Sequence, residues 1–125
     1  MPDSSCVCSA RFQEALRQAG RPDTELLALD AQHLQTQHLA QLLQHIKLAG
    51  KDSMLTVLSL EDNVLTDESC ALLRDALQDA SACPQLMTIN LQANVGVTPL
   101  GHEHLRDALK ERPDLKVRAS TFVML

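Results

Sequence analysis

The four cysteines carry the most diagnostic chemistry in the chain, because thiolates can bind metals, form disulfides or act as nucleophiles. Cys6 and Cys8 are separated by a single residue, unlike the usual paired cysteines of a zinc site, and no second close pair follows. Cys70 lies among helical leucines and Cys83 precedes a predicted strand, where cysteine commonly packs as a small hydrophobic residue. We therefore expect buried roles for Cys70 and Cys83 and no metal site.

The histidines could act as bases or ligands only if acids or nucleophiles converged on them. His38 and His45 share a face of a predicted helix, but no acidic residue follows at the spacing of a metalloprotease motif. His102 and His104 are two residues apart and diverge on a helix. We expect solvent-exposed histidines. Because the sequence also lacks a glycine-rich phosphate loop and a paired-carboxylate motif, an enzyme is the least favoured class and no cofactor is expected.

A repeated leucine pattern indicates the elements that must position these side chains. Leu55, Leu58, Leu60 and Asn63 form an L-x-x-L-x-L-x-x-N motif, which returns 31 residues later at positions 86–94. Alternating leucines predict a strand, and the residues that follow have helical spacing. A strand and a helix that repeat together every thirty or so residues are typical of a solenoid.

The pattern extends to about four helix–strand units. The leucines predicted to open the strands are Leu26, Leu55, Leu86 and Leu115. Strands are predicted at roughly 27–31, 56–60, 87–91 and 116–120. Because a helix joins each strand to the next, the strands should be parallel and the crossovers right-handed. We predict an α/β fold, a short right-handed solenoid with a parallel sheet on its concave face and helices on its convex face.

Details within the units give further expectations. Asn63 and Asn94 should bond to backbone groups in the turns and form a ladder between layers. The equivalent position in the first unit is predicted to be His33 or Leu34. In the last unit, Arg118 falls where an inward leucine is expected, and residues 95–97 indicate an insertion. Such departures are typical of terminal repeats.

The composition limits the classes of partner. The chain has 125 residues, a formal net charge of −5 and no long basic run, so nucleic acid is not an expected partner. No stretch reaches the roughly eighteen apolar residues of a membrane helix, so no membrane partner is expected either. We expect a soluble, cytoplasmic protein with reduced thiols, a flexible segment over residues 1–8 and one repeat domain over residues 9–125.

Outward-facing strand residues are the candidate binding positions, because they have no packing role and are held on rigid strands. The predicted partner-binding residues are Asp30, Gln32, Ser59, Glu61, Asp62, Thr88, Asn90 and Gln92. This set is polar to acidic, which favours a partner with a basic or mixed surface. The leading hypothesis is a non-enzymatic protein-interaction module, or a small subunit of a larger assembly, that uses this face and the loops at 32–34, 61–64 and 92–97.

The repeats resemble the ribonuclease-inhibitor-like class of leucine-rich repeats over residues 12–120, because units of 29–31 residues each contain a full helix. Within that class, residues 86–109 resemble the last part of the tropomodulin and leiomodin repeat domain. There, as at Pro99-Leu100-Gly101 here, a polar loop leads into Pro-Leu-Gly and a helix. That family caps the slow-growing end of actin filaments. The resemblance implies an alternative function in actin capping or cytoskeletal scaffolding, with residues 95–101 near actin.

Overall fold

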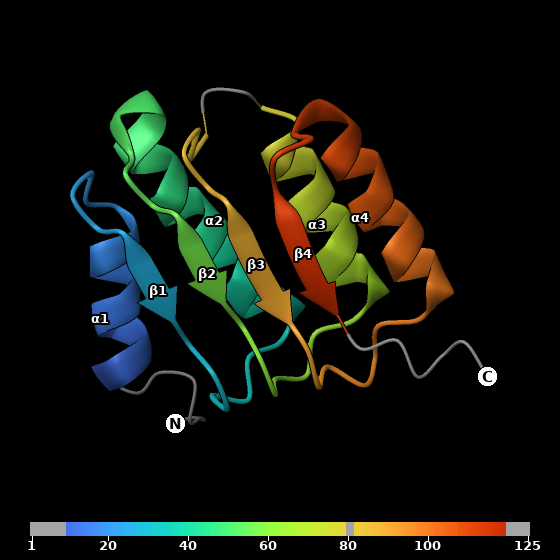
Figure 1. Cartoon of the computed structure of the whole chain (residues 1–125). Coiled ribbons are helices and arrows are strands. Elements are labelled where there is room, and N and C mark those ends of the chain that lie inside the picture. Colours follow the sequence, from blue (N-terminus) through green and yellow to red (C-terminus); the bar gives the residue numbers. More distant parts are fainter. Residues whose placement is uncertain (1–9, 80–81, 120–125) are drawn as a thin grey trace.

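Helices and strands alternate along the chain in the computed structural model, which describes residues 10–79 and 82–119 (Figure 1). In order they are α1 (Ala10–Ala19), β1 (Leu26–Ala28), α2 (Thr36–Ala49), a 3-10 turn (Gly50–Asp52), β2 (Val57–Ser59), α3 (Asp67–Leu77), β3 (Thr88–Leu91), α4 (Pro99–Glu111) and β4 (Lys116–Ala119). Every strand begins within one residue of its predicted start. The segment predicted to be flexible, with Cys6 and Cys8, lies outside the described residues.

The strands form one parallel sheet in the order β1-β2-β3-β4, so strands that follow one another in the chain are neighbours in space. Helices α2, α3 and α4 lie behind the sheet in Figure 1, and the other face of the sheet is open toward the viewer. This arrangement is the predicted solenoid of four helix–strand layers. Its parallel strands place all strand-to-helix loops at one edge of the sheet.

The core lies between the sheet and the helices. Leu27, Leu58 and Ile89 align across the first three strands, and each is at most 1 % exposed. Burial of each such side chain contributes about 1.5–3 kcal/mol to folding. Leu60 and Leu91, two residues further along their strands, are equally buried. The predicted inward positions of the two central units are therefore confirmed.

The first layer has a different register from the predicted one. Leu27, and not Leu26, occupies the position of Leu58, while Leu26 faces outward and is 57 % exposed. A slip of one residue would exchange these faces, so burial of Leu27 and Leu29 selects the observed register.

The same register corrects the predicted equivalent of Asn63 in the first layer. Gln32 occupies that position, instead of His33 or Leu34, because β1 and β2 pair with a constant offset of 31 residues.

The last layer also differs from the prediction. Val117 pairs with Ile89, and Arg118 pairs with Asn90 on the open face, where its side chain is exposed. Arg118 therefore does not occupy an inward leucine position. The last unit has one residue fewer between Leu115 and its first inward strand residue, and the strand shifts so that Val117 rather than a charge faces the core.

The asparagine ladder is confirmed. Oδ1 of Asn63 accepts hydrogen bonds from the backbone N–H groups of Gln32 and Leu34 at 2.9 and 3.0 Å, and its amide nitrogen donates to carbonyls of its own and the preceding layer. Asn94 repeats this arrangement one layer later, accepting from the Leu65 N–H at 3.1 Å. The ladder fixes each strand-to-helix turn to its neighbour.

The expected insertion after Asn94 is present as one extra residue before the cap of α4, Thr98, compared with the cap of α3, Thr66. The longer loop forms an isolated bridge between Gly96 and Thr66. A Cβ atom at Gly96 would lie 2.9 Å from the Leu65 carbonyl oxygen, so this close approach requires glycine.

His38 is buried, which corrects the expectation that it is exposed to solvent. Its Nδ1 accepts the Gln35 backbone N–H at 2.9 Å, which helps to cap α2, and its ring packs edge-on against Phe12. Burial lowers the pKa of His38, so the neutral ring remains the acceptor at neutral pH. The other histidines are exposed or partly exposed, namely His33, His45, His102 and His104.

Cys70 and Cys83 are buried free thiols, as predicted. Burial raises the pKa of Cys70 to about 12 and also raises the pKa of Cys83. Both thiols therefore remain protonated at neutral pH and act as packing groups.

Candidate protein-interaction surface

The open face of the sheet carries three rows of outward side chains. The first row is Leu26, Val57, Thr88 and Lys116, the second is Ala28, Ser59, Asn90 and Arg118, and the third is Asp30, Glu61 and Gln92. Neighbouring strands in a sheet are about 4.8 Å apart, so the rows bring residues from all four layers together. We call this surface the open face.

Five of the predicted binding residues form a continuous hydrogen-bond network on the open face. Oδ1 of Asp30 accepts the Ser59 hydroxyl at 2.6 Å and the Glu61 backbone N–H at 3.0 Å. Asn90 donates to Oε1 of Glu61 and accepts the backbone N–H of Gln92, both at 3.0 Å. The network fixes the polar groups of the first three layers in place before any partner binds.

The other three predicted residues lie outside this network. The backbone N–H of Gln32 donates to Asn63, and its side chain donates to the Asp30 carbonyl at 3.3 Å, so Gln32 supports the turn. Asp62 is exposed in the next turn, with a φ of 58°. Thr88 is half-buried in the first row.

Lys116 and Arg118 were not among the predicted binding residues, because the sequence suggested only that they protect an edge strand. Both are exposed on the open face, in the rows that include Thr88 and Asn90. Correct alignment of Val117 with the inward leucines would have revealed them. The open face therefore has carboxylates on its first two layers and cations on its last.

Asp67, the first residue of α3, holds the start of α4. Its carboxylate accepts the Thr98 hydroxyl, the Thr98 backbone N–H at 2.7 Å and the Gly101 backbone N–H at 3.1 Å. Burial acts to raise the pKa of Asp67, but these hydrogen bonds together lower it below its ordinary value. A Cβ atom at Gly101 would overlap the Asp67 carboxylate, so glycine is required there.

Arg112 holds the opposite edge of the sheet. It lies at the end of α4, and its guanidinium donates to the backbone carbonyls of Leu77, Asp79 and Cys83 at 2.7–2.9 Å and also to that of Ala82. We had assigned Arg112 to the last strand as an edge charge. The structure instead makes it a support for the turn between α3 and β3, through contacts about thirty residues away in sequence.

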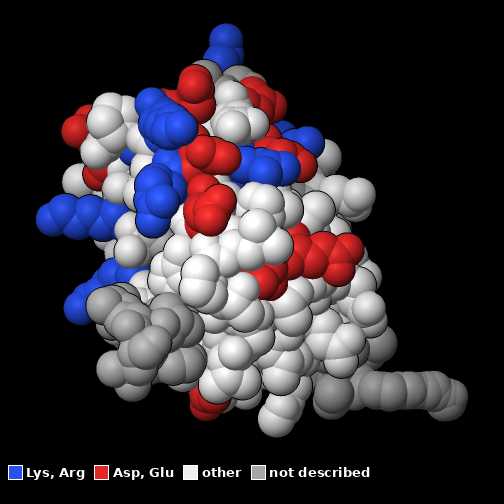
Figure 2. Space-filling model, turned by 90° about the vertical axis from the view of Figure 1, so that its right-hand side faces the viewer, with Lys and Arg blue, Asp and Glu red and all other residues white. Residues whose placement is uncertain are grey.

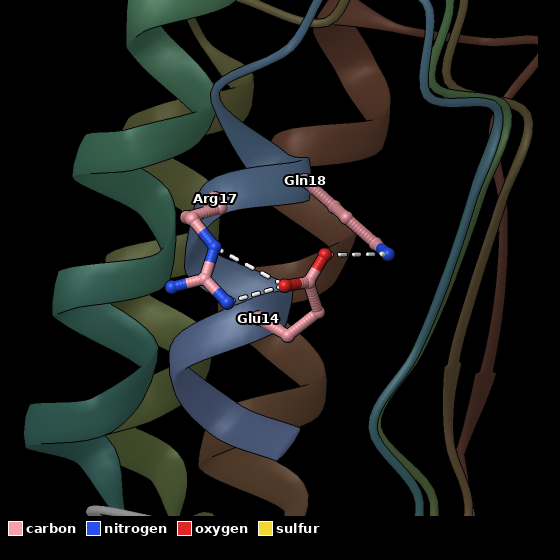
Figure 3. A network of polar contacts seen from close by, with 3 residues as sticks. All are labelled: Glu14, Arg17 and Gln18. Atoms are coloured by element: carbon pink, nitrogen blue, oxygen red, sulfur yellow. Dashed lines mark hydrogen bonds and ion pairs between the residues drawn. The ribbon is translucent and has the colours of Figure 1, made fainter. Parts of the chain in front are cut away.

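Glu14, Arg17 and Gln18 form an exposed polar cluster on α1 (Figure 3). Arg17 pairs with Glu14, and Gln18 donates to the second carboxylate oxygen at 3.3 Å. The hydrogen bond from Arg17 and its positive charge lower the pKa of Glu14, so the carboxylate remains ionised at neutral pH. Both carboxylate oxygens are engaged by neighbouring side chains, which is typical of a surface ion pair.

The described residues show no other arrangement with catalytic or metal-binding geometry. Within 10–79 and 82–119, no three His, Cys, Asp or Glu side chains gather as metal ligands would. Arg74 contacts Nδ1 of His104 at 2.9 Å on the helical face, away from the buried thiols. None of the helices in this part of the chain is both long and apolar enough to cross a membrane.

Comparisons with known proteins identify a similar fold. No protein-family model matches the chain, and no curated protein matches it in sequence. A solved structure described as "Leiomodin-1 Actin-Binding Site 2 (ABS2)" is similar, with a TM-score of 0.73 and 16 % sequence identity. The similarity covers 89 % of this chain but 62 % of that one, so this chain spans less than two thirds of its neighbour. At this identity the likeness establishes the fold.

Proposed function

We propose that this chain is a non-enzymatic protein-interaction module that binds a protein partner through the open face and the loops at 32–34, 61–64 and 92–97. The observation that carries the proposal is the network linking Asp30, Ser59, Glu61, Asn90 and Gln92. Side chains already held in place lose little conformational entropy when a partner binds. We also propose that the repeats belong to the ribonuclease-inhibitor-like leucine-rich class, in one domain over residues 9–125 of a cytoplasmic protein.

The charges of the open face support selective binding. Asp30 and Glu61 lie on the first two layers, whereas Lys116 and Arg118 lie on the last. Complementary charges at fixed positions increase the association rate and exclude partners with the wrong charge pattern. The predicted partner surface is therefore mixed, with basic groups over the first layers and acidic groups over the last.

The test is affinity capture from the native source, using the wild type and the triple variant Asp30→Lys, Glu61→Lys, Asn90→Arg. We expect the variant to lose at least tenfold of the specifically captured partner. A matched control, Asp23→Lys, Asp52→Lys, Gln85→Arg, introduces the same charge change at exposed positions in the helix-to-strand turns. The control should capture the partner normally.

A second variant separates binding from folding, because the triple variant breaks the network. Thr88→Arg lies in the first row and removes none of the hydrogen bonds described above. Its helical circular dichroism should match that of the wild type, while its partner capture should fall. If folded Thr88→Arg and the folded triple variant both capture every partner normally, the open face is not the binding surface.

Actin is the second candidate partner, favoured by the description of the structural neighbour as an actin-binding site and by the Pro-Leu-Gly turn at the start of α4. Under this proposal the chain is a cytoskeletal capping or scaffolding component, with residues 95–101 near actin. The test is pointed-end elongation of pyrene-labelled actin. Slowed elongation at micromolar protein supports this candidate, and unchanged elongation rejects it.

A further inference from the structure

The strand-to-helix halves of the layers contain no Lys or Arg. Segments 26–46, 57–73 and 88–105 carry only acidic charges, which are Asp30, Glu61, Asp62, Asp67, Glu68 and Glu103. The whole chain has eleven Lys and Arg residues, and all of them fall outside these segments. In Figure 2, Lys and Arg are absent from the lowest part of the face shown, while cations and acids mix above. Charge is therefore segregated along the strand direction.

We call the loops and first helical turns that follow β1, β2 and β3 the carboxyl edge, comprising residues 29–37, 60–69 and 92–103. Three large apolar side chains are exposed there: Val64 at 47 %, Val95 at 79 % and Leu100 at 54 %. Val64 and Val95 each directly follow a ladder asparagine, so they occupy equivalent positions in neighbouring layers. An apolar group of this kind among acids and without cations is a feature of a binding surface.

Rigid contacts hold this apolar group in place. Asp67 fixes the turn that carries Leu100, through its bonds to Thr98 and Gly101. The bridge between Gly96 and Thr66 fixes the loop that carries Val95. Val64 is tied to the first layer, because its backbone N–H donates to the Leu34 carbonyl at 3.0 Å.

A surface hollow lies beside Val64, between the starts of α2 and α3. It is lined by Gln35, Thr36, Gln37, Val64, Thr66 and Glu68. Its floor is ordered by hydrogen bonds from the Thr36 hydroxyl to the hydroxyls of Thr66 and Ser69, at 3.3 and 2.8 Å. The hollow can accept a side chain that projects from a partner.

We infer that the carboxyl edge binds a basic amphipathic helix of the protein partner, with apolar side chains on Val64, Val95 and Leu100 and Lys or Arg near the exposed acids. This inference rests on the proposed function and names the chemistry of the partner. Neighbouring layers are about 5 Å apart at the strands and about 10 Å apart at the helices. Apolar residues four or seven positions apart on a helix are separated by about 6 or 10 Å, which matches this range.

The probe is a synthetic amphipathic peptide of about 14 residues, with Leu at helical spacing and Lys elsewhere, whose affinity is measured by fluorescence anisotropy. Two comparison peptides have Glu in place of Lys, or the same Leu and Lys in an order without helical periodicity. Because the contact combines apolar and ionic parts, only the first peptide should bind tightly, and its affinity should fall as salt is added.

The variant Val95→Ser with Leu100→Ser should weaken binding of this peptide at least tenfold. Its matched control is Leu48→Ser with Met54→Ser, whose side chains are exposed to a similar extent, 74 % and 42 %, away from the carboxyl edge. Neutralising Asp62, Glu68 and Glu103 to the corresponding amides should also weaken binding and reduce its salt dependence. The same change at the exposed acids Asp52, Glu111 and Asp114 should have less than a twofold effect.

Equal weakening by both serine pairs, or equal binding of the peptide without helical periodicity, would overturn the inference. The proposed function is tested separately. If the amphipathic peptide fails to bind while the open-face variants still lose the native partner, this inference fails and the proposed function stands. If the native partner binds the open-face variants normally, the proposed function fails whatever the peptide does.

Discussion

The two edges of the sheet are stabilised by different chemistry. At the carboxyl edge, Asn63, Asn94 and Asp67 hold the backbone through neutral amides and a carboxylate that accepts three hydrogen bonds. At the amino edge, formed by the helix-to-strand turns, Arg112 donates to four backbone carbonyls. The first edge leaves apolar side chains exposed without nearby cations, and the second is rich in both charges. Rigidity is common to both edges, but only the carboxyl edge combines it with an exposed apolar group.

Loss of an asparagine from the ladder should cause the largest change in stability. Asn63→Ala should lower the free energy of unfolding by about 3 kcal/mol, because several buried backbone groups would lose their partners. Urea denaturation followed by circular dichroism measures the effect. A loss below about 1 kcal/mol would show that the ladder does not hold the carboxyl edge.

Crowding at the start of α4 should have the next largest effect. Gly101→Ala should destabilise the protein by about 2 kcal/mol, because the new methyl group overlaps Asp67 and lies 3.1 Å from Sγ of Cys70. Gly20→Ala is the matched control, since its nearest neighbour would be at 3.4 Å, an ordinary contact. Equal melting temperatures for the two variants would contradict the tight packing described at Asp67.

The amino edge should depend on Arg112 to a smaller extent, because its guanidinium is partly exposed. Arg112→Ala should cost about 1.5 kcal/mol, and Arg112→Lys should recover only part of this, since an ammonium cannot match the fork of donors. Arg106→Ala, an exposed position on the same helix, should stay within about 0.5 kcal/mol of the wild type. If Arg112→Ala costs more than Asn63→Ala, the ranking of the two edges is wrong.

The smallest effect concerns the pH dependence of Asp67. A carboxyl group whose pKa is lowered by folding stabilises the fold above its ordinary value of 3.8, and this contribution is lost as the pH falls through the lower folded value. The wild type should therefore lose stability more steeply than Asp67→Asn below about pH 4. Urea midpoints measured from about pH 5 to pH 2.5 test this, and parallel curves would exclude a folded-state role for the charge.

The sequence was sufficient for the fold and the two central layers. The inward pattern of Leu58, Leu60, Ile89 and Leu91 is local and regular, and the ladder asparagines follow it at fixed spacing. These features depend on periodicity within one unit, which a single sequence displays.

The terminal layers and the supporting contacts could not be predicted in the same way. A shift of one residue moved Leu26 and Arg118 to the opposite face, and such shifts are decided by burial in the neighbouring layer. The bonds of Asp67 and Arg112 join residues about thirty positions apart, and no spacing rule signals them. Burial of His38 likewise depends on Phe12 in the preceding helix.

The most direct test of the interaction surface is hydroxyl-radical footprinting of the wild type, alone and with its captured partner. The two edges carry comparable exposed reporters, Val95 and Leu100 at the carboxyl edge and Leu48 and Met54 toward the amino edge. We predict that the partner lowers oxidation of Val95 and Leu100 several-fold and leaves Leu48 and Met54 unchanged. Protection of Leu48 and Met54, with Val95 and Leu100 still oxidised, would contradict the account.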